Sequence, residues 1–329
     1  MKNASWVKII ILIALAALTW KVLAGEASVS VSVNDEQGAP IRGAKVTASW
    51  YGVRAPGSGW GVGDVKSASA ISDELGKCNL SVGGGEGGIG ATKEGYYWRG
   101  VGPEYEKQFT APLNAMNHVN VTIILIKKTN PVPMYVREIR SLEVPELGIP
   151  IGFDLIEGAW VKPYGKGIYG DMSVLVLQEV RARDDFDKSF VIKFSGDMGG
   201  VQLSNQPLRT RTCELRLPRE APEDGYEKEF EKKEFKRPNG QSKILFNENA
   251  NFIFRFSRDK ADGDNTASKL LYGKIHGDIA VGTGNPPVRK PTISFRYYLN
   301  PSGSKSLEWD MGKNMVSPND PQGEVPKDP

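Results

Sequence analysis

The chain has 329 residues, enough for two ordinary domains that each bury a hydrophobic core. Its first 24 residues hold three lysines and no acidic residue; removing those three from the total of 42 lysines and arginines leaves 39, which equals the number of aspartates and glutamates. Beyond residue 24 the chain is therefore formally neutral, which excludes a bulk electrostatic attraction to nucleic acid or to an anionic membrane surface.

Residues 1–24 have the layout of a signal peptide. Two lysines come before an apolar run that begins at Ile9, and a site of small residues ends at Ala24. The apolar run is about a dozen residues long, whereas a helix needs roughly 20 apolar residues to cross a bilayer. We therefore predict cleavage after Ala24, no membrane span after cleavage, and a periplasmic, cell-surface or secreted protein. The alternative is an uncleaved N-terminal anchor.

Short alternating runs predict β-structure in the first part of the chain. Residues 28–33, SVSVSV, alternate between valine and serine, which gives a strand one buried and one wet face. A polar turn then leads into a second strand that ends at Trp50, and the glycine-rich residues 52–65 are typical of a long loop. Residues 118–126 close the region with a strand that is apolar on both faces.

Three stretches of this region, in order, resemble a known family. They are SVSVNDEQGAPIRGAKVTA, SDELGKCNLSV and ATKEGYY, and they are similar to the turn-and-strand motifs of the transthyretin-like, carboxypeptidase regulatory-like β-sandwich. Gly38 and Gly76 suit its tight turns because glycine takes positive φ at little cost. The likeness covers residues 26–127 and departs from the family pattern in the long loop and at Cys78. It implies an immunoglobulin-type sandwich in an exported protein, and it implies no activity.

A second β-rich domain is predicted over residues 134–310. The boundary falls within residues 128–134, where two prolines cannot donate to a sheet ladder. In the longer strands that follow, aromatic residues share one face, and Lys193, Arg255 and Arg296 lie across the pleat, where we expect a wet face. This part resembles only uncharacterised exported bacterial proteins, so the resemblance implies no function for it.

Two segments of the second part do not fit its strand pattern. Residues 222–240 are dense in mixed charge and indicate a short helix or a projecting hairpin. Residues 311–329 are polar and rich in proline, and we predict a disordered tail there. The fold class predicted for the whole chain is all-β, with two β-sandwich-like domains and helix only in short pieces.

Residue types that commonly carry catalysis or bind metals are sparse. His118 and His276 are the only histidines, and a zinc site needs three or four ligands at suitable spacing. Two acidic clusters exist, namely Asp184, Asp185 and Asp187, and Asp259, Asp262 and Asp264. Either cluster could be a calcium loop or an acidic turn, and we favour the turn because neither has the ligand alternation of an EF-hand. We predict no catalytic residue, no metal and no cofactor.

One further group combines carboxylates with aromatic residues. It consists of Asp154, Glu157, Asp171, Trp160, Tyr164 and Tyr169. Two carboxylates about 5–10 Å apart can form the acid pair of a glycosidase, and neighbouring aromatic rings suit a sugar. The same composition suits a turn that is packed by aromatic side chains, and this is the interpretation we favour.

The two cysteines are predicted to be free. Cys78 shares a strand face with Leu80, and Cys213 shares one with Leu215, so alternation places each thiol in an apolar core. We expect these cores to belong to different domains. A disulfide requires Cα atoms about 4.4–6.8 Å apart, so two buried free thiols are expected.

A candidate binding surface is aromatic. Trp60 lies between glycines in its loop, and Tyr96, Tyr97 and Trp98 are consecutive. Exposed aromatic rings in loops supply a large contact area with few torsions to fix. The alternative, which we favour, is that Trp60 packs on Tyr97 or Trp98 as a small satellite core, because exposed tryptophans promote aggregation.

These observations predict an exported, non-enzymatic β-protein with an interaction or scaffolding role at the cell envelope or outside the cell. Its partner would be another envelope protein or a glycan, and not a nucleic acid. The alternative is a carbohydrate-binding or glycan-processing protein with its site in residues 134–310. A concave site there, in which carboxylates and aromatic rings converge, would favour the alternative.

Overall fold

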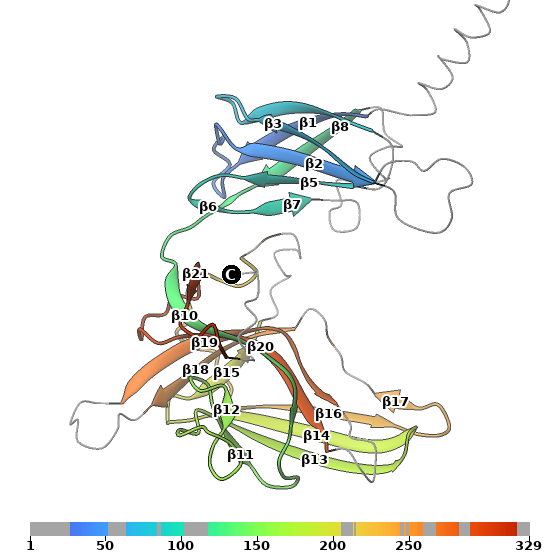
Figure 1. Cartoon of the computed structure of the whole chain (residues 1–329), viewed down its shortest axis with the longest axis vertical. Coiled ribbons are helices and arrows are strands. Elements are labelled where there is room, and N and C mark those ends of the chain that lie inside the picture. Colours follow the sequence, from blue (N-terminus) through green and yellow to red (C-terminus); the bar gives the residue numbers. More distant parts are fainter. Residues whose placement is uncertain are drawn as a thin grey trace, which may run out of the picture. The chain divides into compact units, whose positions relative to one another are not determined.

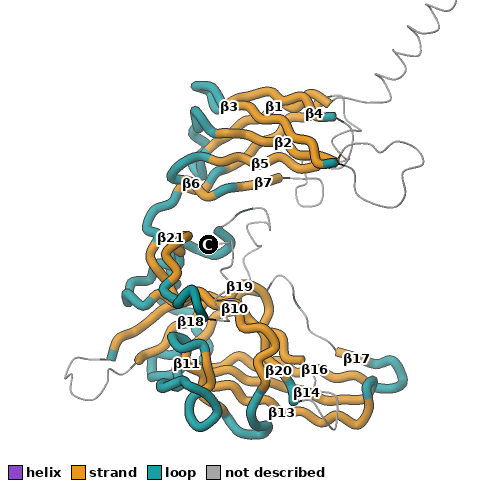
Figure 2. The backbone as a smooth tube through the Cα atoms, viewed as in Figure 1, coloured by secondary structure: helices purple, strands orange, loops and turns teal. Residues whose placement is uncertain are grey.

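The computed structural model describes residues 27–51, 64–83, 87–101, 118–204, 213, 215–243, 247, 250–258, 268–282 and 290–320. All regular structure in these ranges is β-strand, which confirms the all-β prediction (Figure 2). None of them forms a helix that is long and apolar enough to cross a membrane. The predicted signal peptide and Trp60 lie outside the described residues.

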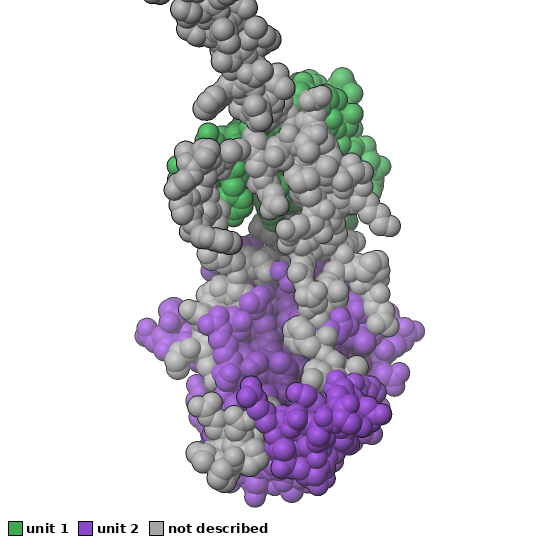
Figure 3. All heavy atoms as spheres, turned by 90° about the vertical axis from the view of Figure 1, so that its right-hand side faces the viewer, with its two compact units in different colours: residues 1–128, 210–214 green, residues 129–209, 215–329 purple. Residues whose placement is uncertain are grey.

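The chain divides into two compact units (Figure 3). Unit 1 comprises residues 1–128 and 210–214, and unit 2 comprises residues 129–209 and 215–329. The boundary between the two units thus falls between Lys128 and Thr129, at the start of the predicted boundary segment. The return of residues 210–214 to unit 1 was not foreseen from the sequence.

Unit 1 is a sandwich of two sheets (Figure 1). Its strands are β1 Ala27–Asn34, β2 Lys45–Tyr51, β3 Val65–Ile71, β4 Lys77–Val82, β5 Gly87–Thr92, β6 Tyr96–Tyr97, β7 Arg99–Val101, β8 His118–Ile124 and β9 Ile126–Lys127. One sheet has the order β4-β1-β8 and the other β3-β2-β5-β7, while β6 pairs with β9. Val29, Val31 and Val33 of β1 are buried in the core between the sheets, as the serine–valine alternation predicts.

Unit 2 is a larger sandwich. Its strands are β10 Val132–Glu143, β11 Ile151–Asp154, β12 Ala159–Trp160, β13 Met172–Ala182, β14 Asp185–Phe194, β15 Gly200–Leu203, β16 Glu229–Lys236, β17 Ser242–Lys243, β18 Asn251–Arg258, β19 Lys269–Gly282, β20 Thr292–Asn300 and β21 Trp309–Asn314. The sheets have the orders β15-β18-β19-β20-β10-β21 and β12-β11-β13-β14-β16-β17. Their facing sides form one core, in which Phe194 stacks on Phe254 with ring centroids 4.6 Å apart.

Two expectations for unit 2 are resolved by these strands. The mixed-charge segment 222–240 contains β16, which lies in the sheet between β14 and β17 and pairs with β14 along its whole length, so it is neither a helix nor a hairpin that projects from the sheet. Lys193 is exposed as expected, whereas Arg255 and Arg296 are only partly exposed. The Arg255 guanidinium carbon lies 4.1 Å from the Tyr226 ring centroid, because the segment after residue 215 covers this side of the sheet.

The predicted disordered tail is wrong for its first part. Residues to Asn314 belong to β21, which pairs in parallel with β10. The Asn314 side chain accepts a hydrogen bond from Val136 N–H (3.0 Å) and donates one to Val136 C=O (3.0 Å). The polar composition wrongly predicts disorder here because polar side chains hold the strand in place. Residues 321–329 lie outside the described residues.

Both cysteines are buried and neither forms a disulfide, as predicted. Their assignment to different domains is wrong, because Cys213 forms an isolated antiparallel bridge with Arg99 and its segment belongs to unit 1. Alternation predicts which face of a strand is buried, but it does not predict which sheet a short segment joins.

Candidate binding sites

The structure separates the aromatic residues that were predicted to form a binding surface. Tyr97 is only 1% exposed, and the Lys128 ammonium lies 5.3 Å from its ring centroid. Tyr96 is half-buried and packs against the core of unit 1. Trp98 alone of the described three is well exposed, at 41%. The predicted contact between Trp60 and these rings involves a residue outside the described ranges.

The Trp98 ring lies against the backbone of β5 and β7. Gly90 and Gly100 are paired across these strands. A Cβ atom on Gly90 would lie 2.9 Å from Trp98 Nε1, and one on Gly100 would lie 2.7 Å from Cη2 of the same ring. The indole therefore needs glycine beneath it, and the strands hold it as a rigid, half-exposed aromatic surface.

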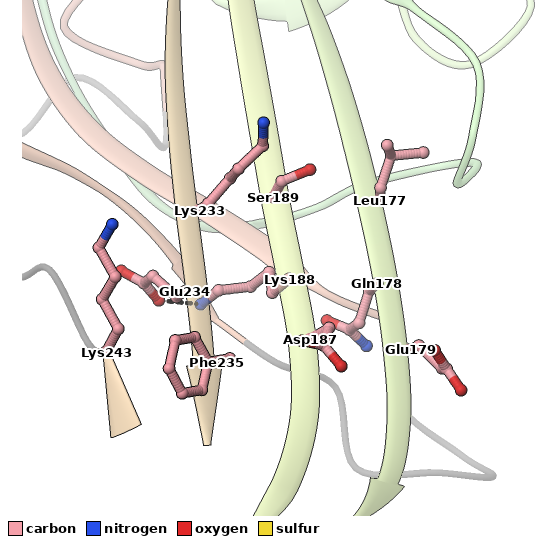
Figure 4. Close-up of a pocket in the computed structure, with 10 residues that line it drawn as sticks. All are labelled: Leu177, Gln178, Glu179, Asp187, Lys188, Ser189, Lys233, Glu234, Phe235 and Lys243. Atoms are coloured by element: carbon pink, nitrogen blue, oxygen red, sulfur yellow. Dashed lines mark ion pairs between the residues drawn. The ribbon is translucent and has the colours of Figure 1, made fainter. Parts of the chain in front are cut away.

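A groove of about 620 Å³ lies on the sheet of β13, β14, β16 and β17 in unit 2 (Figure 4). Its lining residues are Leu177, Gln178, Glu179, Asp187, Lys188, Ser189, Lys233, Glu234, Phe235 and Lys243. They carry three carboxylates and three ammonium groups. Antiparallel register brings them together, since Gln178 pairs with Lys188 and Lys188 with Glu234.

Buried ion pairs extend inward from the groove. Lys188 Nζ lies 2.8 Å from Glu234 Oε2 (Figure 4), and both side chains are almost wholly buried. Lys232 Nζ lies 3.6 Å from Glu234 and 2.6 Å from Asp278 of β19. Asp278 also accepts a hydrogen bond from Asn247 N–H at 2.8 Å. These linked pairs fix the positions of the groove residues and tie the two sheets together.

The acidic cluster at one side of the groove is neutralised by arginines. Asp187 accepts hydrogen bonds from Arg181 and Arg237, each at 2.6 Å, and Asp185 accepts one from Arg181 at 2.9 Å. These hydrogen bonds lower the pKa of both carboxyl groups. No three His, Cys, Asp or Glu side chains among the described residues are grouped to hold a metal. The acidic cluster 259–264 lies outside those residues.

The suspected carboxylate–aromatic site is occupied by the protein's own donors. Asp154 accepts hydrogen bonds from four backbone N–H groups, at residues 156, 157, 168 and 169. Arg258 NH2 lies 2.7 Å from Asp154, and its Nε lies 3.1 Å from Asp171. Burial raises the pKa of Asp171 to about 7. Glu157 faces Lys166 at 3.8 Å. The cluster therefore fastens the loop of residues 154–171.

The aromatic members of that group are also engaged. Trp160 is buried, and its Nε1–H donates to Glu143 C=O at 2.8 Å. Tyr164 donates to the Glu146 carboxylate. The Tyr169 ring centroid lies 4.4 Å from the Arg258 guanidinium carbon. Trp160 and Tyr164 thus hydrogen-bond to groups outside the carboxylate cluster, while the Tyr169 ring lies over the arginine that pairs with Asp154 and Asp171.

A buried lysine in unit 2 was missed at the level of sequence. Lys274 of β19 is 0% exposed; its Nζ has no hydrogen-bond partner among the described residues and lies 4.8 Å from the Tyr298 ring centroid. Burial lowers its pKa to about 7. His276 packs on the same ring at 4.6 Å, and burial lowers its pKa well below the usual value. Both residues lie across the pleat from the core residue Ile275, so alternation by itself would indicate an exposed face for them.

The chain has no match among models of protein families or among curated proteins. Its function therefore has to be inferred from the groove, the Trp98 surface and the buried charges.

Proposed function

We propose that the chain is an exported, non-enzymatic interaction protein that holds a segment of a partner protein in the groove of unit 2. The observation that carries this proposal is the lining of the groove, which offers carboxylates, ammonium groups and two apolar side chains on one rigid sheet. A polypeptide segment carries the same mixture of groups. A polyanion would meet the like charges of Glu179 and Asp187.

The charged residues of the groove are better suited to binding a peptide than to acid–base catalysis. Most of them are already paired within the protein, such as Lys188 with Glu234 and Lys233 with Glu231 at 2.9 Å. Paired charges on strands keep their geometry and are not free to act as an acid or a base. Lys243 makes no ion pair with a described residue, so its ammonium is available to a carboxylate of the partner. Leu177, exposed on the outer face, provides an apolar contact.

The N-terminal sequence supports an exported location. Residues 1–24 have the layout of a signal peptide, and the first unit resembles a sandwich that commonly accompanies exported proteins. In that setting a second unit with a binding groove fits a scaffold or adaptor at the envelope.

The groove proposal predicts the effect of reversing the charge of Lys243, the one charged residue of the groove that has no ion pair with a described residue. Peptides that bind the full wild-type chain can be selected from a random display library. Their affinity for the Lys243→Glu variant should be at least about tenfold lower than for wild type, which corresponds to about 1.4 kcal/mol. Lys193→Glu is the matched control, because Lys193 is an exposed lysine of the same sheet outside the groove. Titration calorimetry measures both. Selected peptides that bind Lys243→Glu and wild type equally would place recognition elsewhere.

The Trp98 surface favours a second candidate, a glycan-binding role. A half-exposed indole held flat on glycines is suited to stack on a sugar ring, with no side-chain torsions left to fix. This candidate places the glycan on unit 1 rather than on unit 2, where it was expected from the sequence.

Replacing one glycine tests the glycan candidate. Gly90→Ala puts a methyl group 2.9 Å from Trp98 Nε1 and displaces the ring, so glycans retained by wild type on an array should bind at least about tenfold more weakly. Gly88→Ala is the matched control, because its Cβ would meet only Val101 O at 3.4 Å. Equal loss in both variants, or retention in Gly90→Ala, would argue against the Trp98 surface.

A further inference from the structure

β3, Val65–Ile71, is a sheet edge with no second partner strand among the described residues. It is the outermost strand of the sheet β3-β2-β5-β7, and among the described residues it pairs only with β2 (Figure 1). Its seven residues pair without a bulge, contain no proline and carry one charge, on Lys66. Natural edges are usually blunted by charges, prolines, bulges or short length, and β3 has little of this protection.

The backbone of β3 has hydrogen-bonding groups that face away from β2. Ser72 follows the strand, and its N–H donates to Ala44 C=O at 2.9 Å on the β2 side. Antiparallel strands alternate their bonding direction from residue to residue. Counting back from Ser72, the N–H and C=O groups of residues 65, 67, 69 and 71 therefore point to the open edge. Another strand can bond to all four of these residues.

We propose that β3 pairs antiparallel with β3 of a second copy of this chain, across a two-fold axis at Ala68. In this register Val65 faces Ile71 of the second copy, and Ser67 faces its Ser69. All four residues with open backbone groups are then paired on both copies. A register shifted by two residues in either direction leaves one of the four unpaired. The interface uses the same strand twice, as a two-fold dimer requires.

The side chains agree with this register. Val65 and Ile71 are 67% and 60% exposed, and on the same sheet face each covers the other across the axis. Lys66 faces Ala70 of the second copy rather than another cation. The two lysines are four residues apart along the paired strands, roughly 14 Å at 3.4 Å per residue. That distance exceeds the Debye length of about 8 Å at physiological salt, so their repulsion is largely screened.

The size of the contact predicts a reversible dimer. A seven-residue strand is a small contact compared with the roughly 1,600 Å² that a standard stable interface buries. The population of dimer should therefore rise with chain concentration over the micromolar range and above. Sedimentation velocity on the full chain measures this dependence directly.

A pair of double variants tests the register. Ser67→Lys with Ser69→Lys sets two lysines against each other at both symmetric positions, and the dissociation constant should rise at least about tenfold. Ser67→Lys with Ser69→Glu sets opposite charges at the same positions, and dimerisation should match or exceed that of wild type. Both variants lose the Thr47–Ser69 hydroxyl contact of 2.9 Å, so the comparison cancels that loss. Thermal melting verifies that both remain folded.

The dimer experiments can fail without affecting the peptide-binding and glycan-binding proposals. A wild-type chain that stays monomeric at every concentration, or a dimer that is equally strong in both double variants, would overturn the β3 pairing. Neither result would bear on the groove, because the peptide and glycan experiments measure different surfaces.

Discussion

Replacing Asp154 with alanine should lower the free energy of unfolding by about 3–5 kcal/mol. The carboxylate is 1% exposed and accepts hydrogen bonds from four backbone N–H groups and from Arg258. Without it, the four N–H groups and part of a buried guanidinium lose their acceptor. An unpaired buried donor costs far more than a missing surface contact. Urea unfolding followed by circular dichroism measures the loss.

Glu157→Ala is the control for this prediction. Glu157 lies in the same turn but is more exposed, and its ion pair with Lys166 is 3.8 Å long. Exposed pairs of this kind contribute about 0–1 kcal/mol. If Asp154→Ala and Glu157→Ala had similar effects, the network around Arg258 would not be what fastens the loop.

Much of the fold follows from local sequence. The SVSVSV run forms β1 with its valines inside, and the turn glycines Gly38 and Gly76 have φ of +84° and +71°. These features depend on a few adjacent residues, so period-two alternation and turn chemistry predict them. The tail was missed because Asn314 anchors β21 through its side chain, and composition carries no information about such a partner.

The sites are harder to predict because they depend on register between distant strands. Gln178, Lys188 and Glu234 have the alternation of the core-facing side of their strands although they are polar, and only pairing of β13, β14 and β16 brings them together. Trp98 was predicted as a candidate because it belongs to a run of three aromatic residues. Its contact with Gly90 and Gly100 depends on the pairing of β5 with β7. Sequence alone therefore finds residue types and misses the geometry that makes a surface.

Lys274 shows how a covering segment changes the meaning of a pattern. Ile253 and Tyr272, on the same side of the sheet, pack with Leu217 and Leu307, which come from segments without strand periodicity. The sheet is thus buried on both sides at this point. Alternation identifies two faces but cannot tell whether the outer one is covered.

Replacing Lys274 with methionine should raise the free energy of unfolding by roughly 1–4 kcal/mol near neutral pH. The amine is fully buried and no described residue hydrogen-bonds to it, so folding removes it from water and returns only its contact with the Tyr298 ring. Methionine has a similar length and no polar atom to desolvate. Lys193→Met, at an exposed lysine, should stay within about 0.5 kcal/mol of wild type.

The stabilisation by Lys274→Met should also decrease as the pH rises. Burial lowers the pKa of Lys274 from 10.5 to about 7, with Glu308 opposing the shift and Arg216 adding to it. Between these two values the folded state binds fewer protons than the unfolded state, so wild-type stability rises with pH through this window. The advantage of Lys274→Met should therefore be largest at about pH 7 and below, and should shrink toward about pH 10.

Urea unfolding of both proteins at about pH 7 and about pH 9.5 separates this effect from that of His276. The pKa of His276 in the folded state lies well below 6.5, so over this range the folded imidazole is neutral and the unfolded one mostly neutral, and its contribution is the same in both proteins. A stabilisation that is constant with pH would mean that Lys274 does not change its charge on folding. A destabilised Lys274→Met would mean that the buried amine makes a favourable contact, and that the cost of its burial has been misjudged.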